Sequence, residues 1–247
     1  MIRPFMADLH VHSLLSPCAA VEMTPRNIVR HAAAAGVELL AITDHNAADN
    51  VKAAMQAAVG SGVTVWPGME VETKEEIHVL ALFDKMHALQ QWQYYVEQCR
   101  SKLRNDPNRF GAQFVVDAED NLLAEKPEML LAPLTGGIAE ISRKIHELGG
   151  LCIASHVDRP AYSILSQLGF IPDDVELDAI EVSGRMLSQD AALRFPAIAG
   201  RTVIRNSDAH SIDDFLTGPK TVFYVEEPTV AELRLALRGQ AGRHMDS

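Results

Sequence analysis

The sequence contains histidines at a spacing that suits metal binding. Residues 8–12 read DLHVH, which places His10 and His12 two residues apart. Side chains at this spacing on a β-strand point to the same face, so the two imidazoles could bind one metal ion. Residues 208–210 read DAH and repeat the pattern with a carboxylate in place of the first histidine. The two pairs predict metal-dependent chemistry.

Similar residue types recur where other predicted strands meet loops. They are His45, Glu70, His78 and His156, so that six strand boundaries carry His, Asp or Glu. The remaining histidines lie in helical or terminal contexts and are interpreted as structural; they are His31, His87, His146 and His244. Imidazole with carboxylate, and without paired thiolates, fits Zn, Mn or Fe. Two or more such ions could bind a phosphate oxygen and activate a water, which predicts phosphate-ester hydrolysis.

Short apolar runs alternate with helical patterns along most of the chain. The predicted strands are 5–9, 38–43, 64–67, 78–83, 151–155, 179–182, 203–206 and 221–225. The predicted helices between them are 25–36, 49–59, 137–148, 188–195 and 229–238. This alternation predicts a parallel sheet with crossover helices, and seven or eight strands would close it into a barrel. Catalytic residues of barrel enzymes gather at the carboxyl ends of the strands, where most of the candidate ligands fall.

Residues 84–136 interrupt this alternation. A polar helix over 86–104 is followed by a strand–turn–strand pattern at 113–123. We expect an insertion within a single domain that spans residues 1–247. The basic run within it is interpreted as a charged helix face, since no aromatic stacking pattern accompanies it; the run consists of Arg100, Lys102, Arg104 and Arg109.

Composition excludes several classes of protein. No apolar run is long enough to span a membrane, the start is too short for a signal peptide, and three cysteines are too few for a disulfide framework. We therefore expect a cytoplasmic protein. Lys and Arg number 22 against 33 Asp and Glu, and the net charge of −11 argues against wrapping by nucleic acid. The sequence has neither the Gly-x-Ser-x-Gly elbow of serine hydrolases nor a phosphate-binding loop.

The ordered series of motifs resembles the PHP (polymerase and histidinol phosphatase) domain family over residues 6 to 225. Its motifs are DLHxH at 8–12, ITDH at 42–45, GME at 68–70, His78, SH at 155–156 and SDAH at 207–210. The resemblance is greatest to stand-alone bacterial metal-dependent phosphoesterases. It implies an α/β fold, a distorted (β/α)7 TIM-like barrel, with two or three divalent metal ions.

The resemblance also implies which residues bind each metal. The ligands would be His10, His12, Glu70 and Asp208 for the first ion, Glu70, His78 and His156 for the second, and His45 and His210 for the third. Cys18 falls where histidinol-phosphatase-like members carry a histidine, and the aspartate of the Ser-Asp-Gly variant is absent. Two interpretations of Cys18 stay open: a thiolate ligand, or a packing residue beside a weak third site.

The expected reaction is attack of a metal-bridging hydroxide on phosphorus. Glu70 and Asp208 would act through the metals, Asp158 would orient a ligand or act as an acid, and Arg159 and Arg185 would bind the substrate phosphate. The expected partner is a small phosphorylated substrate or a nucleotide, with no stable nucleic-acid complex and no membrane. Two alternatives remain: a metal-binding regulatory or scaffold module with little catalysis, and a nuclease or nucleotide phosphodiesterase. The oligomeric state and the metal identity are not predicted.

Overall fold

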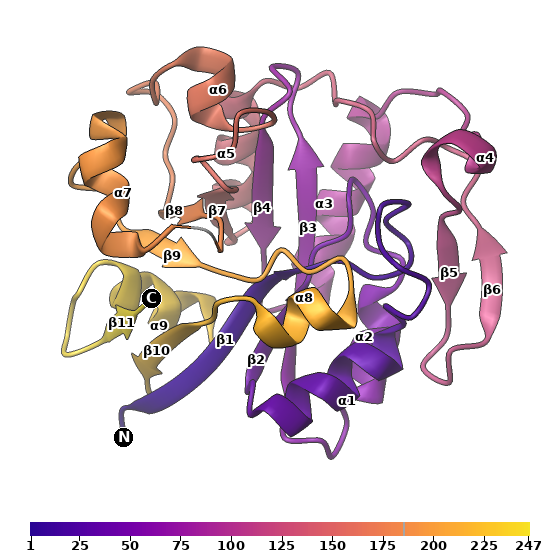
Figure 1. Cartoon of the computed structure of the whole chain (residues 1–247), viewed down its shortest axis with the longest axis horizontal. Helices are drawn as coiled ribbons and strands as arrows, with labels where there is room; N and C mark the ends of the chain where they lie inside the picture. Colours follow the sequence, from indigo (N-terminus) through magenta and orange to yellow (C-terminus); the bar gives the residue numbers. More distant parts are fainter. Residues whose placement is uncertain (185) are drawn as a thin grey trace.

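A computed structural model describes residues 1–184 and 186–247, and within them one nine-stranded sheet dominates the molecule (Figure 1). The order of its strands is β11-β10-β1-β2-β3-β4-β7-β8-β9. The bounds are β1 (Arg3–Val11), β2 (Leu39–Ile42), β3 (Thr64–Glu72), β4 (His78–Leu82), β7 (Leu151–Ala154), β8 (Ala179–Val182), β9 (Val203–Arg205), β10 (Thr221–Val225) and β11 (His244–Asp246). The eight predicted strands are all present.

Helices follow most of the strands and pack on the sheet. Their bounds are α1 (Pro25–Ala35), α2 (Val51–Ala57), α3 (Met86–Cys99), α4 (Pro107–Phe110), α5 (Ile138–Glu147), α6 (Ile164–Leu168), α7 (Ser188–Arg194), α8 (Ile212–Thr217) and α9 (Val230–Leu237), with a 3₁₀ turn at Pro196–Ile198. Helix α1 begins as its sequence predicts: the Thr24 side chain accepts a hydrogen bond from the Asn27 N–H, Pro25 occupies the first position, and Gly36 ends the helix at φ 75°. In the described part of the chain, no helix has the length and apolar character needed to cross a membrane.

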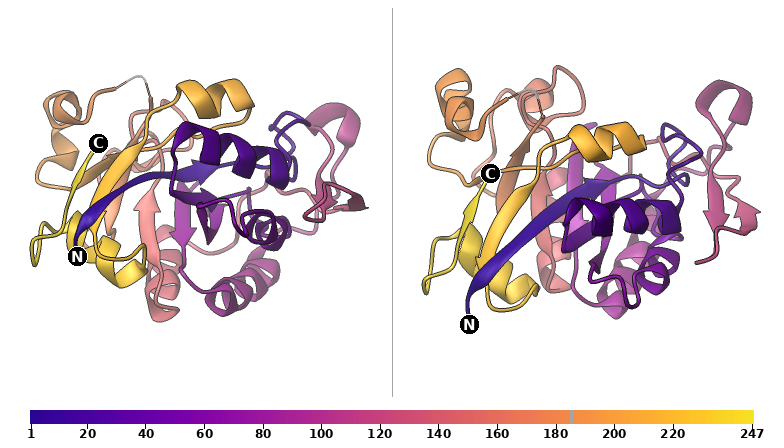
Figure 2. Two further views of the ribbon diagram at one scale, coloured as in Figure 1. Left: turned by 90° about the horizontal axis from the view of Figure 1, so that it is seen from below. Right: turned by 60° about the horizontal axis from the view of Figure 1, so that its bottom comes forward.

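The sheet is mixed, which corrects the expectation of a parallel barrel. The pairs β1/β2, β2/β3, β7/β8 and β8/β9 are parallel, whereas β1/β10, β3/β4 and β4/β7 are antiparallel. The sheet curls, as Figure 2 shows from two directions, and a single bridge between Val11 and Ala209 links β1 to the loop after β9. The fold is therefore a mixed α/β half-barrel, and the finer expectation of a (β/α)7 barrel is not confirmed.

A tight turn explains why β4 runs antiparallel to β3. Only residues 73–77 separate the two strands, whereas a parallel crossover needs about a dozen residues or more. Within the turn, the Thr73 N–H donates to the Ile77 carbonyl over 2.9 Å, and Glu76 adopts φ 60°. Glu72 consequently pairs with His78, so that the start of β4 lies at the same edge of the sheet as the end of β3.

Two apolar clusters fill the two sides of the sheet. One includes Ile28, Val71 and Ile141 and joins the sheet to the surrounding helices. The other includes Leu9, Trp66 and Phe223 on the inner side of the curl, where α9 adds Leu233. These side chains are almost fully buried and hold the strand ends that carry the candidate ligands.

The segment predicted as an insertion divides into two parts. Helix α3 buries Leu89, Trp92 and Val96 in the larger core cluster. Beyond it, α4 and the hairpin of β5 (Phe114–Val116) and β6 (Leu122–Glu125) project from one side of the molecule (Figure 1). The predicted charged helix face is wrong, because α3 ends at Cys99 and the four basic residues follow it in the loop and in α4.

Candidate metal centre

The structure brings eight predicted ligands together at one edge of the sheet. They come from the end of β1, the loops after β2, β7 and β9, the body of β3 and the start of β4: His10, His12, His45, Glu70, His78, His156, Asp208 and His210. His78 reaches this edge because β4 is antiparallel; in a parallel strand its position would lie at the opposite end. In β1, the register shifts between Asp8 and Val11, and such a bulge redirects side chains.

Glu70 lies at the centre of the cluster and is almost fully buried. The ring nitrogens nearest its Oε1 atom belong to His10 at 3.3 Å, His78 at 3.3 Å and His156 at 3.4 Å. Those nearest its Oε2 atom belong to His45 at 3.2 Å and His12 at 3.4 Å. Glu70 Oε1 has no hydrogen-bond partner among the described residues. A buried carboxylate oxygen left in this state is costly, so the site favours a cation.

The separations between these atoms match a metal coordination shell. Zinc bonds of about 2.1 Å in a tetrahedron place neighbouring ligand atoms roughly 3.4 Å apart. The distances around Glu70 are 3.2 to 3.4 Å, and Asp208 Oδ1 lies 3.2 Å from His10 Nε2 and 3.4 Å from His12 Nε2. The residues present therefore fit divalent metal ions.

Hydrogen bonds fix which nitrogens of His10 and His12 face the cluster. His10 Nδ1 lies 3.0 Å from the Glu181 carboxylate, which can only accept. His12 Nδ1 lies 3.0 Å from Ser16 Oγ, whose own hydrogen is donated to Asp44 over 2.7 Å. Each Nδ1 therefore carries a hydrogen. The two Nε2 atoms, 3.2 Å apart, face one another and require a proton or a shared cation between them.

Glu181 is a functional residue that sequence reasoning missed. Besides His10, its carboxylate accepts from the Asn206 side chain at 2.7 Å and from the His156 N–H at 3.2 Å. It lies in β8, a strand of sequence AIEV that is buried throughout. The sequence does contain a sign of its role: Glu181 is the one carboxylate in an apolar strand, and a buried charge needs a partner.

Two further carboxylates hold the backbone around the ligands. Asp44 accepts from the Ser13 N–H at 2.7 Å as well as from Ser16, and so fixes the loop after β1. Asp8 pairs with Lys220 at 3.0 Å and accepts from the Ser207 N–H at 3.1 Å. The loop that carries Asp208 is thereby tied to β1.

The pKa values show how protons balance the charge of the cluster. Burial opposes the charged form of His12, but hydrogen bonds to Asp208 and Glu70 outweigh it and raise its pKa to about 9. Burial likewise opposes ionisation of Glu70, yet His10 and His78 hold its pKa well below its usual range. Burial and the nearby His12 lower the pKa of His210 to about 4. Protons on some imidazoles therefore neutralise the carboxylates, a role that bound cations would take over.

Three groups of side chains bring their ligand atoms within 4.8 Å of one another. They are His10 with His12 and Asp208, His45 with Glu70 and His78, and His12 with His45 and His210. Cys18 belongs to none of these groups in the described part of the chain, and its side chain is exposed. Although the residue is exposed, desolvation of its thiol by the neighbouring residues, followed by the charge of Glu70, raises the pKa of Cys18 to about 12.

The predicted phosphate-binding and acid residues lie beside the cluster. Arg159 Nη2 is 2.5 Å from Asp208 Oδ2, and the side chain is 43% exposed. Asp158 accepts two hydrogen bonds from Ser183, at 2.7 Å from its N–H and 2.6 Å from its hydroxyl, and so connects the loops after β7 and β8. Both residues line a cavity of about 680 Å³ that also reaches Asp208 and His210. Arg185 lies outside the described residues.

Two of the candidate ligands have strained backbones. His156 adopts φ 30° and Asp208 adopts φ 50°, values in the left-handed region that side chains other than glycine rarely occupy. Strain of this kind costs about 1–3 kcal/mol per residue and persists where the surroundings impose it. Here it accompanies the placement of both side chains in the cluster.

The structure combines a mixed α/β half-barrel with a buried imidazole–carboxylate cluster at one sheet edge, an arrangement suited to binding divalent metal ions. Residues 8–179 match the model of the PHP domain, and the chain belongs to this family.

Known relatives extend this comparison. A 5'-3' exoribonuclease of Haemophilus influenzae is 34% identical over 128 residues, a match that covers 45% of this chain and 46% of the relative. The lesion-specific endonuclease PfuEndoQ of Pyrococcus furiosus has a similar structure, with a TM-score of 0.74 and 22% identity over 98% of this chain and 58% of that one. A complex of Endonuclease Q with an abasic duplex at its active site gives a TM-score of 0.71, at 22% identity and the same coverage. The chain thus spans about half the length of these relatives.

These relatives correct one expectation. The prediction of a small phosphorylated substrate or nucleotide, with no stable nucleic-acid complex, is wrong, because similar chains include an exoribonuclease and an endonuclease solved with duplex substrate. The net charge of −11 led to the error. Phosphate contacts are local, and a metal centre with a few arginines can attract a polyanion to one face of an acidic protein.

Proposed function

We propose that the chain hydrolyses phosphodiester bonds of nucleic acids with two or three divalent metal ions, Zn, Mn or Fe. The observation that carries the proposal is the convergence of Glu70, His10 and His12 at ligand-to-ligand distances with their acceptor atoms facing one another. Metal ions bound there would polarise the phosphate and activate a water. The first ion would bind His10, His12, Glu70 and Asp208, the second Glu70, His78 and His156, and a third His45 and His210.

The protein side chains would orient the phosphate. Arg159 contacts the Oδ2 atom of Asp208, and its side chain is partly exposed to the cavity of about 680 Å³. When a cation binds Asp208, the guanidinium can donate two parallel hydrogen bonds to a phosphate. Asp158, held by Ser183, would keep this loop in place and so act as a positioning residue.

A basic segment supports nucleic acid as the substrate. Arg100 reaches the carbonyl of Asn46, the residue that follows His45, over 3.5 Å. Lys102, Arg104 and Arg109 continue from it and are exposed. Glu97, Asp106 and Glu128 lie among these basic residues, but the exposed side chains of Lys102, Arg104 and Arg109 would be available for contacts to a phosphate backbone.

The proposal is tested with metal-loaded protein and single-stranded and duplex DNA and RNA oligonucleotides. We expect hydrolysis of at least one class by the wild type, and a loss of at least 100-fold for His12→Ala and Asp208→Asn. His87→Gln, an exposed histidine on α3, is the matched control and should retain wild-type rates. Absence of cleavage with every nucleic acid, while the protein binds stoichiometric metal, would reject a nuclease and favour the regulatory alternative.

A further inference from the structure

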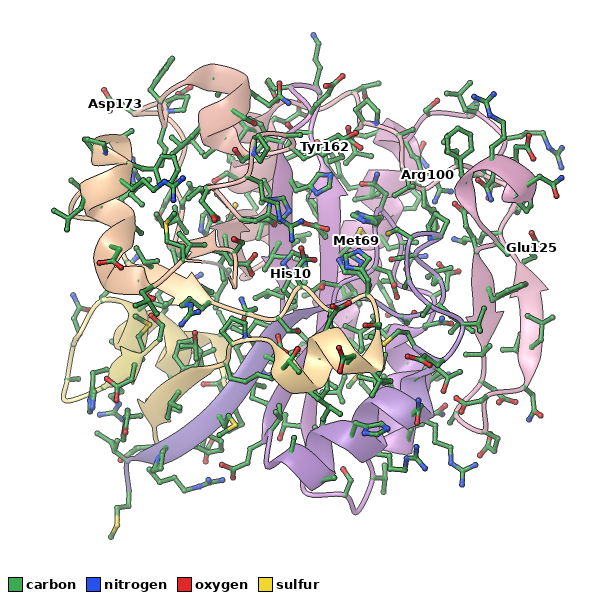
Figure 3. All side chains as sticks on the ribbon, in the orientation of Figure 1. His10, Met69, Arg100, Glu125, Tyr162 and Asp173 are labelled. Carbon is green, nitrogen blue, oxygen red and sulfur yellow. The ribbon has the colours of Figure 1, made fainter. Side chains whose placement is uncertain are left out.

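Tyr162 places an aromatic ring at the metal centre that the reaction described above does not use. It lies in the loop between β7 and α6, six residues after His156. Its ring stacks on that of His78, with centroids 4.8 Å apart and planes inclined by 22°. The residue is nevertheless 46% exposed. Figure 3 labels it in the upper part of the side-chain cluster, above His10.

The backbone holds this ring in a costly conformation. Tyr162 adopts φ 57°, in the left-handed region, which is unfavourable for a bulky residue. The His78 N–H donates to the Tyr162 carbonyl over 2.9 Å, which ties the loop to the start of β4. On the other side, Ser163 caps α6, and its hydroxyl donates to the Arg159 carbonyl over 2.8 Å. The loop is therefore braced from both ends, and the ring is positioned before any ligand arrives.

Within seven residues, the same loop carries three side chains that could each contact a different part of a ligand. His156 is a candidate metal ligand, Arg159 faces the cavity next to Asp208, and Tyr162 offers a partly exposed aromatic ring. A nucleotide presents the matching groups: a phosphate for the metals and the arginine, and a flat base for the ring. Stacking of a base on an aromatic side chain does not depend on sequence, but the base must be unpaired.

We propose that Tyr162 is the stacking platform for an unpaired nucleobase next to the phosphate that is cleaved. The inference rests on the proposed function and specifies its substrate: single-stranded nucleic acid at the point of cleavage. A fixed ring loses little conformational freedom when the base binds, which favours this use of a strained residue.

Tyr162 could instead only shield the ring of His78, and substitutions separate the two roles. Tyr162→Phe keeps both the cover and the aromatic face. Tyr162→Leu keeps an apolar cover over His78 but removes the aromatic face. A shielding role predicts that both variants behave alike, whereas stacking predicts that only Tyr162→Leu is impaired.

The decisive measurement is equilibrium binding to the metal-loaded protein by fluorescence anisotropy. The probes are a phosphorothioate oligothymidylate, which resists cleavage, and an oligomer of abasic residues with the same length and linkages. We expect Tyr162→Leu to bind the oligothymidylate about tenfold more weakly and the abasic oligomer as tightly as the wild type does. Tyr162→Phe should match the wild type on both probes. On a cleavable oligonucleotide, Tyr162→Leu should raise KM about tenfold with kcat unchanged.

Unimpaired binding of oligothymidylate by Tyr162→Leu, or equal losses on both probes, would overturn the inference. A wild type that binds neither probe would overturn it as well. A wild type that binds oligothymidylate but cleaves no nucleic acid would reject the proposed function alone, and the comparison of Tyr162→Leu with Tyr162→Phe would still decide the role of the ring.

Discussion

Glu181 determines the orientation of His10. It also accepts a hydrogen bond from the backbone N–H of another candidate ligand, His156. Its carboxylate accepts from His10 Nδ1, which leaves Nε2 directed at Glu70 and Asp208. We predict that Glu181→Gln weakens metal binding by about 10- to 100-fold, because the amide places a donor where the imidazole N–H needs an acceptor. Competition with a chromogenic chelator for Zn²⁺ or Mn²⁺ measures the change.

Glu140→Gln is the control for this prediction. It removes an exposed carboxylate that bonds only Tyr95 among the described contacts, and metal affinity should not change. Thermal unfolding of the metal-free Glu181→Gln protein verifies that it folds. Metal affinity within twofold of the wild type in a folded Glu181→Gln protein would contradict the role assigned to Glu181.

The candidate ligands could be read from the sequence, and Asp158 was expected to orient one of them, whereas the contact of Glu181 with His10 could not be read from it. His10, His12 and Asp208 stand in two-residue spacings at strand ends, a local pattern that can be read directly. Glu181 acts on a residue 171 positions away, and this pairing depends on the curl of the sheet. The position of Cys18 could be aligned by counting residues, but its exposure follows from the path of the loop.

At the scale of elements, a buried carboxylate joins α5, β7 and α9. Asp178 accepts from His146 Nε2 at 2.8 Å, the Cys152 N–H at 3.0 Å and Arg234 Nε at 2.9 Å. The hydrogen bond to Asp178 raises the pKa of His146 above its unfolded value of about 6.5. A group with a raised pKa stabilises the fold below the unfolded pKa, and this contribution disappears as pH rises through the folded pKa.

We therefore predict that His146→Gln removes a pH-dependent part of the stability. The free energy of unfolding of the wild type should exceed that of the variant most at pH 6, and the difference should shrink towards pH 9. Urea titrations of the metal-free proteins across this range measure it. A difference that stays constant, or grows with pH, would show that the His146–Asp178 contact does not titrate as assigned.

The basic segment that follows α3 leads to a prediction of its own. If Lys102 and Arg104 contact the phosphate backbone, their joint replacement by alanine should lower the salt dependence of oligonucleotide binding by nearly two charges. Binding measured between about 50 and 200 mM salt gives the slope of affinity against salt concentration. Joint replacement of Arg238 and Arg243 in the C-terminal region provides a charge-matched control. Equal slopes for the two double variants would exclude a backbone contact by this segment.

Element positions were predicted better than strand direction. The sequence signals for β3 end near Pro67, but the strand continues to Glu72, which leaves five residues before β4 instead of ten. That difference decides between a crossover and a tight turn. Direction is a property of the connection, so an error of a few residues at one strand end reversed the predicted pairing.

At the scale of the whole molecule, the cluster connects residues from the first strand to the loop after β9. Its carboxylates and imidazoles come from positions 10 to 210, so a bound cation would cross-link segments that are far apart in the chain. A metal that binds the folded state alone adds about 2.7 kcal/mol when its concentration is 100 times the dissociation constant. For a chain of this size, the midpoint of thermal unfolding should rise by about 5–10 °C.

Metal removal tests this cross-link directly. We predict that a chelator lowers Tm by about the amount that metal adds, and that the double variant His12→Ala with Asp208→Asn responds less than the wild type to both treatments, because it loses the ligands of the first ion. His12 and Asp208 belong to the same candidate group, so their loss should remove the shared site without disturbing the apolar clusters. A rise in Tm with metal that is as large in the double variant as in the wild type would show that His12 and Asp208 do not hold a stabilising ion. If the metal-dependent rise in Tm is smaller in the double variant than in the wild type, then the side chains that bind the ion also couple its binding to the stability of the fold.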